Sequence, residues 1–148
     1  MADIACYFGN LHQIWPTPLA GAASIAASMF CGVLVGLERR WRHKPAGLRT
    51  VSLISVGSTV FTLTSVLLAR DAGGDPGRIA AQVVTGVGFL GAGAILHGRQ
   101  TVIGLTTAAS IWMVAAIGLL IGAGYVLPGV AITLLIVLML VTFRHHMD

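Results

Sequence analysis

Charged side chains that could do chemistry gather in one short stretch of this sequence. Residues 38–44 read Glu-Arg-Arg-Trp-Arg-His-Lys, and Arg49 follows shortly after. Glu38 and Arg42 are four residues apart, so on a helix they face each other and predict an ion pair. Two interpretations stay open: a carboxylate that organises a functional loop, or basic side chains that anchor a helix at a membrane interface together with Trp41.

Metal and catalytic chemistry find little support elsewhere in the chain. Magnesium prefers hard oxygen ligands, usually carboxylates. Asp71 and Asp75 could form a weak site at most, and solvation of a charged loop is the other interpretation. Cys6 and Cys31 form no CxxC pair and are predicted to be packing residues. Because nucleophile–base pairs, paired carboxylates and a Walker loop are also missing, we expect no catalytic residues, no metal site, no cofactor and no enzyme activity.

Hydroxyl groups and one amide supply the polar groups inside the apolar stretches: Ser52, Ser55, Ser58, Thr59, Thr62, Thr64, Ser65, Gln82, Thr85, Thr106, Thr107 and Ser110. One interpretation is that they bond between helices or back to their own helix. The alternative is a polar cavity between the second, third and fourth apolar stretches. Residues 86–91 match GxGxxG, but no strand precedes them, so close helix packing is favoured over dinucleotide binding.

Composition indicates what surrounds these groups. Of the 148 residues, 56% are hydrophobic and 9% are charged, whereas a soluble domain carries about a quarter charged residues. A short chain has a high surface-to-volume ratio, so a larger core cannot account for this deficit. The chain is therefore predicted to be an all-α integral membrane protein with the lipid bilayer as its solvent. Nucleic-acid binding is not expected, because the basic residues lie in one loop and at membrane edges.

Five apolar stretches predict a compact bundle of five transmembrane helices, with spans at about 19–37, 51–69, 79–96, 105–121 and 125–143. Each would be roughly 26 to 28 Å long, close to the hydrocarbon thickness. Residues 1–18 are predicted to form an interfacial segment with a short amphipathic helix that Pro16 and Pro18 end, and residues 144–148 a cytoplasmic tail. No basic region precedes the first apolar run, so we expect the first span to remain as an anchor.

Positive charge predicts the orientation of the spans. By the positive-inside rule, the loop at 38–49 faces the cytoplasm. Alternation then places seven of the nine basic residues inside, with Arg70 and Arg78 outside. The predicted topology has the N-terminus outside and the C-terminus in the cytoplasm, which requires an odd number of spans.

Small residues predict how the helices pack, because small side chains let helices approach closely in a bilayer. Ser24, Ser28, Gly32 and Gly36 form a stripe on the first span. The third span is small on several faces, with Gly86, Gly88, Gly91 and Gly93. We expect the third span to lie centrally and the fifth to face lipid, and the stripe on the first span offers a surface for self-association into a homo-oligomer.

Several motifs together resemble the MgtC/SapB family of membrane proteins. The matching segments are 36–42, 46–50, 76–84, 86–93, and 104–109 followed by Trp112, in this order and at the family's spacing. The resemblance covers about 20–144. The family's functional residues that map here are Glu38, Arg39, Arg49, Thr50, Arg78, Gln82, Thr106 and Thr107.

The resemblance implies a multi-pass protein of the bacterial inner membrane that supports adaptation to low magnesium and survival inside macrophages. It further implies regulation of membrane-protein partners, and the basic loop suits protein or anionic-lipid contacts. A transporter or channel for a small cation or solute is the alternative. Many family members continue into a soluble C-terminal domain, so we expect either a short SapB-like member or a truncation, and functions of that domain are not carried over.

Overall fold

The computed structural model describes residues 17–72, 74–75, 77–97 and 101–142. These residues form α3 (Thr17–Trp41), α4 (Leu48–Ala72), α5 (Gly77–Gly93), β1 (Leu96–His97), β2 (Val102–Ile103), α6 (Leu105–Gly122) and α7 (Val126–Thr142). The prediction of an all-α fold is confirmed. Residues 1–16 of the predicted interfacial segment, and the predicted tail at 144–148, lie outside the described residues.

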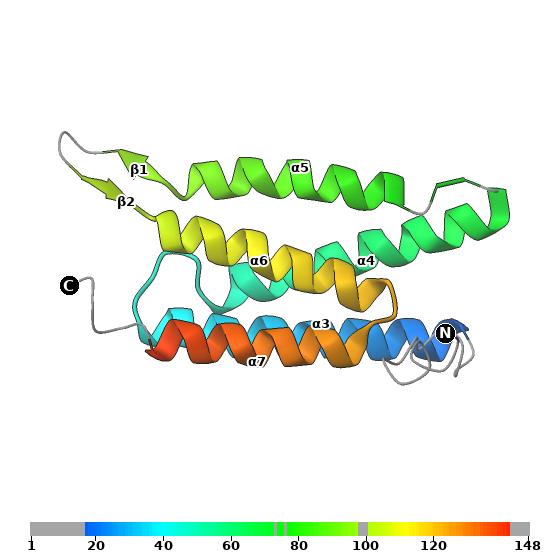
Figure 1. Ribbon diagram of the computed structural model, residues 1–148, viewed down its shortest axis with the longest axis horizontal. Helices are drawn as coiled ribbons and strands as arrows, with labels where there is room; N and C mark the ends of the chain where they lie inside the picture. Colours follow the sequence, from blue (N-terminus) through cyan, green and yellow to red (C-terminus); the bar gives the residue numbers. More distant parts are fainter. Residues whose placement is uncertain (1–16, 73, 76, 98–100, 143–148) are drawn as a thin grey trace.

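The five helices lie side by side and alternate in direction along the chain (Figure 1). α6 is the central helix, because it contacts α3, α4, α5 and α7, while α4 contacts α3, α5 and α6. The prediction that the third helix lies centrally is wrong: α5 flanks the bundle and packs against α4 and α6. Small residues permit close contact on a helix face, but they do not determine which face a neighbour covers.

Most of the glycines of α5 do not contact a neighbouring helix. A Cβ added at Gly86, Gly88 or Gly93 would meet no atom within 4 Å, and a Cβ at Gly91 would lie 3.8 Å from Ala108. Within this chain, the prediction that Gly86, Gly88 and Gly93 pack helices is therefore wrong, whereas Gly91 does face α6.

A short hairpin replaces the end of the predicted third span. α5 ends at Gly93 instead of Leu96, and β1 pairs with β2 in antiparallel register. Gly104 follows the hairpin with φ 97°, and a Cβ there would overlap the carbonyl oxygen of Ala94. Only glycine tolerates both this backbone conformation and this approach, so Gly104 fixes the turn from β2 into α6.

Apolar side chains cover the outside of the bundle. Phe89 is 82% exposed and Leu53 is 70% exposed, and large exposed apolar side chains occur on all five helices. In water, such a surface would be an extensive association hazard. Among the described helices, Pro18–Trp41, Leu48–Ala69 and Leu105–Gly122 are long and apolar enough to cross a membrane, and Val126–Thr142 is a shorter apolar helix. The chain is a membrane protein.

The interior, by contrast, contains a strip of hydroxyl groups on α4. We call Ser52, Ser55, Ser58, Thr59, Thr62 and Ser65 the hydroxyl strip; all six are buried. The Ser55 hydroxyl donates to the Ser28 carbonyl of α3 at 2.9 Å, and the Thr59 hydroxyl donates to the Gly118 carbonyl of α6 at 2.9 Å. The Thr62 hydroxyl donates back to the Ser58 carbonyl at 2.9 Å. For these side chains, the prediction of bonds between helices and back to the same helix is confirmed.

Glycines on the neighbouring helices bring their backbones close to this strip. A Cβ at Gly32 would lie 2.7 Å from Ser52 Cα, and a Cβ at Gly36 would lie 2.7 Å from Leu48 Cα. On α6, a Cβ at Gly122 would lie 2.7 Å from the Thr59 carbonyl oxygen. The small stripe of α3 thus packs against α4 within the chain. Since α4 covers it, this stripe is not available for self-association.

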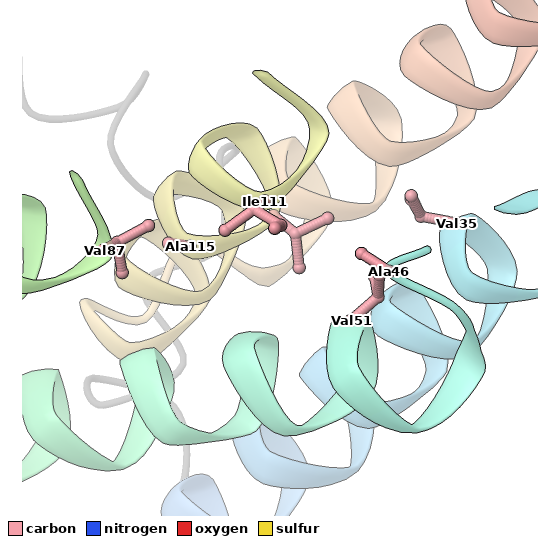
Figure 2. Close-up of a cluster of buried hydrophobic side chains, with 7 residues drawn as sticks. Val35, Ala46, Val51, Val87, Ile111 and Ala115 are labelled. Atoms are coloured by element: carbon pink, nitrogen blue, oxygen red, sulfur yellow. The ribbon is translucent and has the colours of Figure 1, made fainter. Parts of the chain in front are cut away.

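An apolar cluster lies between four of the helices and the loop that follows α3. Val35 of α3, Ala46 of the connecting loop, Val51 of α4, Val87 of α5 and Ile111 of α6 belong to it (Figure 2). Four helices and one loop meet in this cluster. The loop at 42–47 is therefore held against the helices by Ala46 and does not extend freely from them.

We expect Gly118→Ala to separate α4 from α6. The new methyl group would overlap the Ser55 carbonyl oxygen and lie 2.8 Å from Ser58 Cβ, and overpacking of this kind lowers the free energy of unfolding by about 2 kcal/mol. Titration of the detergent-solubilised protein with SDS, followed by helical circular dichroism, measures the change. Gly57→Ala is the matched control on α4, because a Cβ there meets nothing within 4 Å. Equal stability of the two variants would contradict this packing.

Candidate functional site

The most polar part of the described structure lies at one end of the bundle. The C-terminal turns of α3 and α7, the loop at 42–47 and the first turns of α4 and α6 meet there (Figure 1). Residues 38–50 contribute five basic side chains, namely Arg39, Arg40, Arg42, Lys44 and Arg49, and one acidic side chain, Glu38. We call this part of the molecule the basic end.

Glu38 joins two arginines in a largely buried ion cluster. Glu38 is 4% exposed and Arg39 is 2% exposed. Arg39 Nε donates to Glu38 Oε2 at 2.5 Å, and Arg42 Nε lies 2.5 Å from Glu38 Oε1 as an ion pair. The predicted ion pair between Glu38 and Arg42 is confirmed. The pairing with Arg39 was not predicted, because residues one apart on a helix do not normally face each other.

The cluster carries more positive than negative charge. One carboxylate faces two guanidinium groups, and Arg39 Nη1 is buried with no acceptor among the described residues. Arg42 Nη2 also donates to the Val141 carbonyl oxygen at 3.3 Å, which links α3 to the last turn of α7. A buried carboxylate and guanidinium depend on each other, since either one alone would be a desolvated, uncompensated charge.

The turn after the cluster sets the direction of the loop. The His43 N–H donates to the Arg40 carbonyl and the Lys44 N–H donates to the Arg39 carbonyl, while His43 has φ 52°. These two bonds form a Schellman motif, in which glycine usually occupies the left-handed position. The loop therefore leaves α3 in a defined direction, with the side chains of His43 and Lys44 exposed.

Four other predicted site residues also lie at the basic end. Arg49 and Thr50 are exposed in the first turn of α4. Thr106 and Thr107 occupy the first turn of α6; Thr106 is exposed, and Thr107 is 2% exposed. The fold thus brings three of the motif segments, 36–42, 46–50 and 104–109, to one end, although Arg42, which completes the ion cluster, is not among the predicted site residues.

Arg78 and Gln82 lie elsewhere. Arg78 is exposed in the first turn of α5, at the opposite end of the bundle (Figure 1). Gln82 lines a groove of about 470 Å³ between α4 and α5. Apolar side chains and Gly57 and Gly86 form most of the groove, and Ser58 is its other polar lining residue. The groove is thus largely apolar, unlike the polar cavity considered as an alternative.

Asp75 has a structural partner. Its Oδ1 accepts a hydrogen bond from the backbone N–H of Gly77 at 2.8 Å, which caps the start of α5. The side chain of Asp71 is not among the side chains that the structure describes. In the described part of the chain, no group of three His, Cys, Asp or Glu side chains comes together in a way that could hold a metal ion.

Comparison with known proteins decides the family. The model of the MgtC family matches residues 25–147, which is most of the chain. The chain belongs to the MgtC family. The matched range contains the basic end, both α4 interfaces and the groove, so family membership and the described fold concern the same residues.

Relatives within the MgtC family are similar over most of this chain. "Protein MgtC" of Salmonella typhimurium is 47% identical over 113 residues, which cover 76% of this chain and 48% of that protein. "Putative magnesium transporter YhiD" of Escherichia coli is 50% identical over 126 residues, 81% of this chain and 58% of that protein. "Protein MgtC" of Brucella abortus is 42% identical, covering 84% and 52%. The chain spans about half the length of these relatives, and no solved structure matches it.

We expect Glu38→Gln to destabilise the bundle, because Arg39 would keep its buried charge without a carboxylate. Loss of one partner of a buried pair lowers the free energy of unfolding by about 3 kcal/mol. Thermal unfolding in detergent measures the loss. Arg40→Gln is the control, since Arg40 is exposed and its replacement should change the free energy of unfolding by less than about 0.5 kcal/mol. A Glu38→Gln variant as stable as the control would contradict the structural role of the cluster.

Proposed function

We propose that this chain is a multi-pass protein of the bacterial inner membrane with five spans, the N-terminus outside and the C-terminus in the cytoplasm. The alternating helix directions support an odd number of spans, since α3 begins and α7 ends at opposite ends of the bundle (Figure 1). α5 and α7 have 17 residues each, or about 26 Å, which is at the short end for a span. The five basic residues of the basic end support its cytoplasmic placement.

Single cysteines in four connections test this topology. In spheroplasts, a membrane-impermeant maleimide should label Gly74→Cys and Tyr125→Cys, whereas Lys44→Cys and Thr101→Cys should react only after the membrane is disrupted. All four positions are exposed. Labelling of Gly74→Cys and Thr101→Cys from the same side would contradict a span at α5, and a fully reversed pattern would contradict the orientation.

The native cysteines set the background for this experiment. Cys31 is buried in α3, so it should stay unlabelled in the folded protein. Cys6 is replaced by alanine in all variants. The Cys6→Ala protein with no introduced cysteine gives the background level of labelling.

Within this topology, we propose a regulatory role without catalytic activity: the chain supports adaptation to low magnesium and survival inside macrophages by acting on membrane-protein partners. The observation that carries this proposal is the use of the interior hydroxyl groups. Ser55, Thr59, Thr62 and Thr133 donate to backbone carbonyls at 2.8 to 3.1 Å. Hydroxyls used in this way hold neighbouring helices together, which supports a structural use of these groups over a path for a moving ion.

Transport of a small cation is the second candidate function. It is favoured by the similarity to YhiD of Escherichia coli, which is named a putative magnesium transporter. In this chain, the candidate path would run along the α4–α5 groove past Gln82 and Ser58. The apolar lining of the groove argues for a lipid-facing or partner-facing surface instead, because magnesium gives up its water reluctantly.

Flux and growth measurements separate the two functions. We expect proteoliposomes containing the full chain to show no magnesium flux above protein-free liposomes, while a deletion strain grows poorly in low magnesium and recovers when the chain is supplied. Flux that is lost in Gln82→Ala, with Thr64→Ala as an exposed control, would instead establish transport. Normal growth of the deletion strain, both in low magnesium and in macrophages, would contradict the proposed physiological role.

A further inference from the structure

We propose that the exposed side chains of the basic end form a binding surface for the headgroups of anionic phospholipids, with Arg40, Lys44 and Arg49 as the contacting residues. The proposal is argued from the charge of this surface and from its level relative to the lipid headgroups. It rests neither on the regulatory role proposed above nor on the orientation of the chain.

Charge is the first observation. The one acidic side chain of residues 38–50, Glu38, is buried and used by Arg39 and Arg42. It therefore does not neutralise the exposed residues. Five basic residues against one acidic residue leave four positive charges, and Arg39 Nη1 adds a buried donor without an acceptor among the described residues. This end of the molecule therefore presents net positive charge that attracts anionic groups.

The depth of the basic residues is the second observation, and it points to lipid. Arg49 lies one helical turn before Leu53 on the same face of α4. Leu53 is 70% exposed, so in a bilayer it contacts acyl chains, and Arg49 then lies at the level of the headgroups. Trp41 is 75% exposed at the end of α3, and tryptophan is enriched at this same level.

Rigidity is the third observation. The Schellman motif fixes the chain at His43, Ala46 is buried in the apolar cluster, and Arg42 is held by Glu38 and Val141. Arg40, Lys44 and Arg49 are therefore presented by an ordered loop and helix ends. Charges on an ordered backbone lose less backbone freedom on binding than charges on a flexible basic tail do.

Native mass spectrometry of the full chain in neutral detergent tests the proposal by titration with dioleoyl phosphatidylglycerol or dioleoyl phosphatidylcholine. The wild type should bind the anionic lipid about a hundredfold more tightly than phosphatidylcholine, since three basic residues contribute. A basic residue near an anionic surface contributes about a fivefold gain in affinity. The variant Arg40→Gln/Lys44→Gln/Arg49→Gln should therefore bind phosphatidylglycerol about a hundredfold more weakly and phosphatidylcholine as before.

Two control variants separate this surface from general charge and from folding. Arg78→Gln removes an exposed arginine from the first turn of α5, matching the position of Arg49 on α4, and it should retain phosphatidylglycerol binding. Arg40→Lys/Lys44→Arg/Arg49→Lys keeps the charges and should also retain it. Loss of binding in Arg78→Gln to the same extent as in the triple glutamine variant would overturn the assignment to the basic end.

Three further outcomes would also overturn the proposal. Equal affinity of the wild type for the two lipids would show no preference for negative charge. Displacement of phosphatidylglycerol by millimolar inorganic phosphate would indicate a site for the free anion. Unchanged lipid binding by the triple glutamine variant, together with loss of an acidic protein partner from native membrane, would assign the surface to a protein.

Discussion

The close approach of α4 to α3 and α6 is the constraint on which the rest of the bundle depends. Lipid tails are as apolar as leucine, so the hydrophobic effect that drives soluble helices together is missing in a bilayer. The contact is made instead by Gly32 and Gly36 on one side of α4 and by Gly118 and Gly122 on the other. At this distance, the hydroxyls of Ser55 and Thr59 reach the carbonyl oxygens of the neighbouring helices, where no water competes for them.

This arrangement reverses the usual distribution of polarity. The hydroxyl strip lies inside and large apolar side chains such as Phe89 and Leu53 lie outside. The charged groups are confined to the ends, where Glu38 and Arg39 are nevertheless buried. The ion cluster is tolerable there because its three members neutralise each other in part, and because Arg42 reaches the backbone of α7. It joins α3 to α7 next to the loop that Ala46 anchors in the apolar cluster. Packing and charge thus stabilise one shared junction.

Prediction from the sequence succeeded where the signal was local. The apolar runs predict the five helices to within a few residues at most ends, and the spacing of Glu38 and Arg42 predicts their ion pair. Of the two interpretations of the hydroxyls, bonding to helices is confirmed for Ser55 and Thr62. Prediction failed where a partner had to be identified. Gly86, Gly88 and Gly93 have the same residue type as Gly118 and Gly122, yet α5 lies at the side of the bundle and these three glycines face open space. The hairpin after Gly93 was also missed, because its strands have two residues each.

The sequence by itself determined that a lipid bilayer surrounds this protein and which family it belongs to. Composition and the length of the apolar runs are properties of the chain alone, and so are the motifs that place it in the MgtC family. Only the tertiary structure decided which small residues make contacts, which basic residues are buried and which are exposed. Arg39 and Arg40 are neighbours of identical type, but Arg39 is buried in the ion cluster and Arg40 is exposed. Burial depends on which helices pack against each face of α3, and that is settled by contacts between segments far apart in the sequence.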